Sequence, residues 1–118
     1  MGRIDRVNEQ IKREISLIIQ RELSDPRLRF VSITAVDVSR DLRHAKVHFS
    51  VLGNTAQVKE SQESLFRARG IIRKFIADRI VMRYIPELEF FYDRSSEYSS
   101  KIEEALEEIK NESKKNHP

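Results

Sequence analysis

The spacing of apolar residues changes along this chain, and this change limits the folds open to it more than any other feature. Between residues 4 and 23, apolar side chains recur every three or four positions, which is typical of one buried helix face. Between residues 30 and 51 they alternate with polar ones, which is typical of strands in a sheet with one solvent-exposed face. A second helical spacing and a short alternating run follow. With 118 residues, the sequence predicts a single α+β domain.

The first helix is predicted from its apolar stripe, which consists of Ile4, Val7, Ile11, Ile15, Ile18, Ile19 and Leu23. Pro26 has no backbone N–H and disfavours helical geometry at the residue before it, so we expect this helix to end near Ser24–Pro26.

Two strands are predicted next, joined by a turn at Ser39–Leu42 into an antiparallel hairpin. In the first, residues 30–38, the alternation puts Val31, Ile33 and Ala35 on one side and Ser32, Thr34 and Val36 on the other. In the second, one side carries Ala45, Val47, Phe49 and Val51, and the other carries Lys46, His48 and Ser50.

A long helix is predicted from about residue 56 to 83, with an apolar face of Val58, Leu65, Ala68, Ile72, Phe75, Ile76 and Ile80. Gly70 lies in its middle, where glycine costs about 1 kcal/mol relative to alanine, so a kink or a helix break is expected there. Tyr84–Pro86 should end this helix.

A short aromatic strand follows, in which Leu88, Phe90 and Tyr92 alternate with Glu89, Phe91 and Asp93. Ser100–Glu103 matches a capping box and predicts a last helix. We therefore expect one domain over residues 1–94, with a C-terminal helix and a frayed tail over residues 95–118 packed on or beside it.

No motif indicates catalysis, a metal or a cofactor. The sequence has no cysteine, and its three glycines cannot form a glycine-rich phosphate loop. His44 and His48, four apart in a strand, would be separated by about 13 Å, too far to share a metal. No stretch approaches the roughly 18 apolar residues of a membrane span, and the first residues are too charged for a signal peptide. We expect a cytoplasmic protein that is not an enzyme and has no membrane or small-molecule partner.

Positive charge is concentrated in residues 1–94, which hold 18 Lys and Arg against 13 Asp and Glu, whereas residues 95–118 hold 4 against 6. Arginine outnumbers lysine 14 to 8, which suits contacts to phosphate oxygens. The candidate RNA-binding residues are the cations of the hairpin and of the long helix near Gly70: Arg40, Arg43, Lys46, Arg67, Arg69, Arg73 and Lys74.

Two interpretations of these cations stay open at this point: binding to a polyanion, and an ordinary surface of arginines paired with Asp and Glu. Exposed aromatic residues for base stacking are not evident, because Phe49, Phe66, Phe75 and Phe90 all fit core positions. The sequence therefore favours contacts to the RNA backbone over contacts to bases.

Four motifs occur in a fixed order at compatible spacing: Arg6–Ile11, Asp25–Leu28, Ser39–Leu42 with Ala45–Val47, and Ile85–Asp93. Through them, nearly the whole chain resembles the ribosome-binding factor A family of bacterial small-subunit assembly factors. The resemblance implies a KH-like domain of type II topology, α-β-β-α-kink-α-β, with helices on one face of a three-stranded sheet. The Gly-x-x-Gly loop of ordinary KH domains is missing. Ala68-Arg69-Gly70 instead matches the Ala-x-Gly that marks a helix kink in the family.

The resemblance also implies a function. A member of this family would bind the small ribosomal subunit and its rRNA, assist late maturation and 5′-end processing of that rRNA, matter in cold adaptation and leave before translation. We expect it to act as a monomer. The alternative is a KH-like protein–protein adaptor that does not bind RNA directly.

Overall fold

The computed structural model describes residues 2–93 of the chain, and the predicted C-terminal helix and tail lie outside this range. In chain order the elements are α1 (Arg3–Arg21), the 3₁₀ turn η1 (Pro26–Leu28), β1 (Val31–Val38), β2 (His44–Val51), α2 (Thr55–Arg79) and β3 (Glu87–Tyr92). Among the described residues, no helix is long and apolar enough to cross a membrane.

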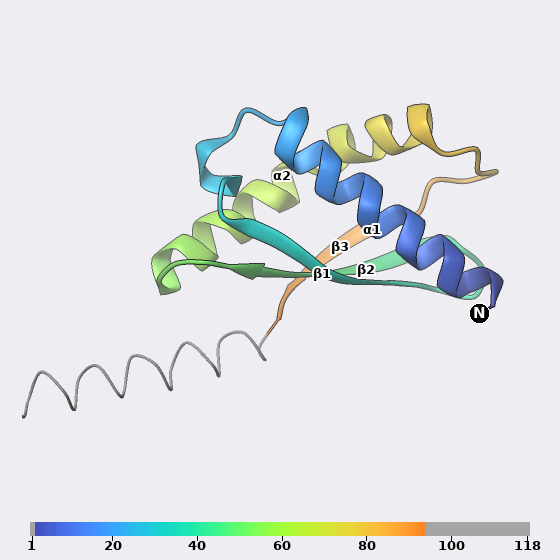
Figure 1. Cartoon of the computed structure of the whole chain (residues 1–118), viewed down its shortest axis with the longest axis horizontal. Helices are drawn as coiled ribbons and strands as arrows, with labels where there is room; N and C mark the ends of the chain where they lie inside the picture. The colour runs from blue at the N-terminus through green and yellow to red at the C-terminus, as the bar shows by residue number, and fades with distance from the viewer. Residues whose placement is uncertain (1, 94–118) are drawn as a thin grey trace, which may run out of the picture.

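The sheet has the strand order β1-β2-β3, so that β2 lies in the centre. β1 pairs antiparallel with β2, which confirms the predicted hairpin, and β3 pairs parallel to β2. Two neighbouring parallel strands need a crossover connection between them, and α2 provides it between β2 and β3. Both helices lie on the same face of the sheet (Figure 1). The predicted α+β class with helices on one face of a three-stranded sheet is confirmed, and the arrangement agrees with the type II KH-like topology.

The core lies between this face and the two helices. α1 contributes four buried isoleucines at the predicted spacing: Ile11, Ile15, Ile18 and Ile19. Val47 and Phe49 of β2 are fully buried beneath the helices. Leu65, Ile72 and Ile76 of α2 are fully buried as well. α1 is also fastened to the sheet by a hydrogen bond, because Asn8 Oδ1 accepts from the Val38 amide at 2.8 Å.

The predicted alternation in β1 is wrong beyond Ile33. Ala35 was expected on the buried side with Val31 and Ile33, but it is exposed, and Val36 and Val38 are buried instead. The pairing with β2 shifts between Ile33 and Ala35, which marks a β-bulge at Thr34. The extra residue turns the valines inward, and burying these larger side chains removes more apolar surface from water than burying an alanine.

Of the kink or helix break expected at Gly70, the break is wrong. α2 continues as an α-helix through Ala68 and Gly70 and ends at Arg79, earlier than the predicted residue 83. Ile80 ends it, with an extended backbone (φ −124°, ψ 131°) and a buried side chain that packs into the core. Val81 to Ile85 then form a loop that leads to Pro86, which is buried.

Candidate nucleic-acid interface

The β1–β2 turn holds two of the candidate cations in place through an acidic residue between them. Asp41 Oδ1 accepts from the Ser39 hydroxyl at 2.6 Å and from the Arg43 amide at 3.1 Å. These two donors hold the pKa of Asp41 below its ordinary value, because they stabilise the charged carboxylate. Leu42 completes the turn in the left-handed region, with φ 62°. The turn thus presents Arg40 and Arg43 to solvent on a fixed backbone.

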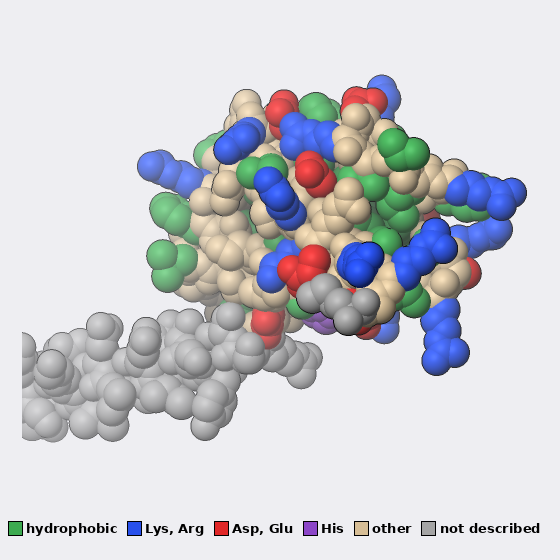
Figure 2. Space-filling view, turned by 45° about the vertical axis from the view of Figure 1, so that its right-hand side comes forward, with side chains coloured by type: hydrophobic (Ala, Val, Ile, Leu, Met, Phe, Trp, Pro, Cys, Tyr) green, Lys and Arg blue, Asp and Glu red, His purple; other side chains and the backbone are tan. Residues whose placement is uncertain are grey.

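The candidate cations do not all share one surface. Ala45 and Val47 point toward the helices, so Lys46, which lies between them in β2, points to the opposite face of the sheet. Arg67, Arg69 and Lys74 belong to α2, on the helical side. Arg40, Lys46, Arg67 and Lys74 are exposed and form no salt bridge within residues 2–93. Lys and Arg side chains are spread over the face in Figure 2, where Asp and Glu are fewer.

Arg73 is the candidate whose hydrogen-bonding groups are already used within the fold. Its Nε donates to the carbonyl of Pro86 at 3.0 Å and its Nη2 to that of Ile85 at 2.8 Å. Its Nη1 also lies 3.3 Å from Glu87 Oε1. Arg73 therefore fastens α2 to the segment that enters β3, and few of its donors remain for RNA.

Arg69 stacks on an aromatic ring that the sequence placed wrongly. Phe66 was expected in the core, but the residue is 60% exposed on α2. The Arg69 guanidinium carbon lies 3.7 Å from the centre of the Phe66 ring, and Nη1 donates to the Phe66 carbonyl. Phe66 directly follows the buried Leu65 in the chain, and the period of the apolar residues did not separate the two positions. The structure thus offers an aromatic surface where the sequence indicated none.

Sequence analysis also missed Arg83 and Tyr84 in the loop between α2 and β3. Tyr84 is 51% exposed, and it borders an open pocket of about 340 Å³ that Arg43 and Arg73 also line. This pocket brings two of the predicted cations together from the hairpin and the long helix. An aromatic residue next to an arginine just before a proline was the available signal, but it was interpreted only as the end of a helix.

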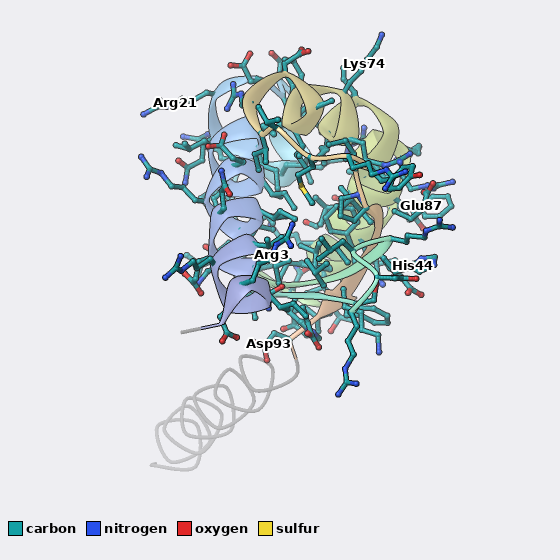
Figure 3. The ribbon with its side chains drawn as sticks, turned by 90° about the vertical axis from the view of Figure 1, so that its right-hand side faces the viewer. Arg3, Arg21, His44, Lys74, Glu87 and Asp93 are labelled. Carbon is teal, nitrogen blue, oxygen red and sulfur yellow. The ribbon has the colours of Figure 1, made fainter. Side chains whose placement is uncertain are left out.

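The side chains of this region can be followed in Figure 3, which views the end of the molecule where β2 begins. Lys74, Glu87 and His44 lie along one side of the molecule, and Arg3 and Arg21 lie on α1. The two halves of α2 run in different directions in this view, so the helix bends although it does not break. A bend suits a helix with glycine in its middle. Its position at Ala68 and Gly70 stays a prediction.

His44 and His48 take ordinary places in the sheet. His44 begins β2 and is exposed, while the ring of His48 lies 5.8 Å from that of Phe91 on the neighbouring strand. Within residues 2–93, no three His, Cys, Asp or Glu residues are grouped so that they could hold a metal ion. The chemistry that these surfaces offer is therefore that of cations and aromatic rings, which contact phosphates and bases.

Residues 3–106 match the family model described as "Ribosome-binding factor A". The ribosome-binding factor A of Halothermothrix orenii is 49% identical over 110 residues, which cover 93% of this chain and 90% of that protein. The one of Brevibacillus brevis is 47% identical over 113 residues, covering 96% and 93%.

Solved structures agree with these sequence matches. The crystal structure of ribosome-binding factor A from Thermus thermophilus superposes with a TM-score of 0.70 at 29% identity, covering 78% of this chain and 97% of that one. A homology model of the Thermus thermophilus factor, as fitted into the cryo-EM map of a 30S complex, gives a TM-score of 0.63 at 32% identity, covering 75% and 92%. Sequence and fold thus point to the same relatives over nearly their full length.

Proposed function

Because this chain belongs to the ribosome-binding factor A family, we propose that it binds the small ribosomal subunit through its rRNA and acts there as a non-catalytic assembly factor. The family match over residues 3–106 is the observation that carries this proposal. It is supported by the Thermus thermophilus relative, a homology model of which was fitted into the map of a 30S complex.

The exposed cations of the hairpin and of α2 supply a physical means of binding. Arg40, Arg43, Arg67 and Lys74 are exposed and can approach phosphates without first breaking a salt bridge to residues 2–93. Each phosphate that such a side chain neutralises releases a condensed counterion, so binding weakens as salt rises. Arg69 on α2 and Lys46 on the opposite face of the sheet add further contacts, and Arg73 keeps the loop before β3 in position.

The protein acts during late maturation of the small subunit and assists processing of the 5′ end of its rRNA, with its greatest importance in the cold. It works in the cytoplasm as a monomer and leaves before translation begins. Cells that lack it should accumulate small-subunit rRNA with an unprocessed 5′ end, more strongly at low temperature. Normal processing at every temperature in such cells would contradict this part of the proposal.

Co-sedimentation with isolated ribosomal subunits tests the proposed binding. The purified protein should sediment with small subunits and not with large ones, and Arg67→Ala should reduce the bound fraction. Arg13→Ala is a matched control, because Arg13 is an exposed helical arginine on α1 outside the candidate set. Equal association with both subunits, or none with small subunits, would overturn the proposal.

The alternative of a protein–protein adaptor makes the opposite prediction in the same assay. An adaptor that binds through apolar surface would stay associated at high salt and would tolerate the loss of Arg40, Arg43, Arg67 and Lys74 together.

A further inference from the structure

Tyr84 is an exposed aromatic residue with two guanidinium groups beside it. The guanidinium carbon of Arg43 lies 5.3 Å from the centre of the Tyr84 ring, and that of Arg83 lies 5.4 Å from it. Both distances are within the roughly 6 Å over which a cation is attracted to an aromatic face. Tyr84 as a residue nevertheless remains 51% exposed, and both arginines are exposed as well. This part of the surface therefore combines an accessible ring with two accessible cations.

The pocket beside Tyr84 is held by the fold on several sides. Its volume is about 340 Å³, and its lining is Arg43, His44, Arg73, Tyr84, Ile85 and Glu87. The Glu87 amide donates to the Arg43 carbonyl at 2.8 Å, which joins the starts of β2 and β3. Arg73 donates to the carbonyls of Ile85 and Pro86 from the side of α2. The loop that carries Tyr84 is thus anchored to a strand and to a helix, and the site is formed before any ligand arrives.

The chemistry of the lining fits a nucleotide. An aromatic face stacks on a base, and guanidinium groups next to it contact the flanking phosphates, as in proteins that bind single-stranded nucleic acid. A paired base inside a helix does not offer its face, so the base must be unpaired. Glu87, whose side chain is 61% exposed, contributes a carboxylate to the pocket. This carboxylate, whose Oε1 lies 3.3 Å from Arg73 Nη1, can accept a hydrogen bond from the amino group of a base.

We propose that Tyr84 is a stacking site for one unpaired base of RNA, with Arg43 and Arg83 contacting the adjacent phosphates. The inference rests on the proposed function, since it assigns to the rRNA-binding surface a contact with a base in addition to contacts with the backbone.

A tryptophan at position 84 would report on stacking directly. The sequence contains no tryptophan, so Tyr84→Trp creates a single tryptophan, which can be excited apart from the remaining tyrosines and whose emission a stacked base quenches. We expect quenching when single-stranded oligoadenylate or small subunits are added. Phe30→Trp is the matched control, because the Phe30 ring is also 51% exposed, lies 5.6 Å from the Arg29 guanidinium and precedes β1 at the opposite end of the sheet. Its emission should not change.

Affinity measurements separate the contribution of the Tyr84 ring from that of the neighbouring arginine charges. Tyr84→Ala should weaken binding to small subunits about tenfold, a typical loss for one stacked base, and leave the salt dependence unchanged. Tyr84→Phe should bind like the parent, because it keeps the ring. Melting curves of each variant establish that the fold is intact.

The outcomes distinguish this inference from the proposed function. If the parent binds small subunits and Tyr84→Ala binds equally well, the stacking site is overturned while the function stands. If the parent does not bind small subunits, the function fails, and the oligoadenylate titration still decides whether Tyr84 stacks. Quenching of Tyr84→Trp by RNA-free ribosomal proteins in place of oligoadenylate would assign the pocket to a protein partner and overturn the inference.

Discussion

At the scale of single residues, the candidate RNA-binding cations differ in how much of their hydrogen-bonding capacity the fold already uses. Arg73 donates to two backbone carbonyls and pairs with Glu87, whereas Arg67 has no such partner within residues 2–93. Arg40 and Arg43 are intermediate in this respect, because Asp41 fixes the backbone of the turn that carries them while their side chains remain exposed. Substitution of arginines with the same formal charge should therefore change the stability of the protein by different amounts.

Arg73→Ala should lower the free energy of unfolding by about 1–2 kcal/mol, because it leaves the carbonyls of Ile85 and Pro86 without their donors. Arg67→Ala should stay within about 0.5 kcal/mol of the parent, as expected for an exposed position without partners. Urea unfolding curves of both variants make the comparison. Equal losses of stability would show that the contacts of Arg73 do not support the fold.

Asp41→Ala should weaken binding to small subunits although it removes a negative charge from a basic surface. Electrostatics alone predicts tighter binding, but the loss of the carboxylate releases the Ser39 hydroxyl and the Arg43 amide and loosens the turn. A binding titration at fixed salt decides between the two effects. Tighter binding by Asp41→Ala would mean that the turn does not position Arg40 and Arg43.

The same carboxylate gives the turn a defined dependence on pH. Because the pKa of Asp41 is lowered in the folded protein, its contribution to stability is present above the ordinary pKa of aspartate. That contribution is lost progressively as pH falls below the ordinary pKa and through the lowered one. An NMR titration of the Asp41 carboxyl should accordingly have its midpoint below that of an unstructured aspartate, and a midpoint above it would contradict the hydrogen bonds of the turn.

At the scale of helices and strands, the sequence predicted every element between residues 2 and 93 apart from η1, but not the local shifts within them. The isoleucine stripe of α1 and the alternation in β2 and β3 are set by one buried face each, and a regular period describes them. The bulge at Thr34 depends on how β1 pairs with β2, which no local pattern contains. The stacking of Arg69 on Phe66 is likewise a contact that periodicity does not encode.

The candidate site shows the same division. The hairpin and α2 were correctly expected to carry exposed cations, because charge in a sequence marks surface positions. Arg83 and Tyr84 were missed because the contact of Tyr84 with Arg43 joins a loop to a turn about forty residues earlier in the chain. Whether the seven candidate residues bind RNA remains a prediction for the variants described above.

Gly70→Ala should stabilise α2. A Cβ built at Gly70 meets nothing within 4 Å, and no glycine among residues 2–93 has a positive φ. Alanine therefore fits without strain, and it should raise the free energy of unfolding by about 0.5–1 kcal/mol, because glycine loses more conformational freedom on folding. Chemical unfolding measures the change. A destabilised variant would show that the bend of α2 needs glycine at this position.

At the scale of the whole molecule, the fold presents cations on both sides of the sheet and at the end where β2 begins. Lys46 points away from the helices, Arg67 and Lys74 lie on α2, and Arg40 and Arg43 lie on the turn. A surface of this kind suits a large, irregular polyanion that touches several sides of the protein, such as folded rRNA. Affinity should then come from many modest phosphate contacts in place of one deep pocket.

The most direct test of this account is the affinity of the parent protein for purified small subunits over a series of salt concentrations. If roughly four or more phosphates are contacted, the logarithm of the association constant should fall against the logarithm of salt concentration with a slope of about −3 or steeper. The combined loss of Arg40, Arg43, Arg67 and Lys74 should flatten that slope. Tight binding with a slope near zero would contradict the account and favour a protein adaptor.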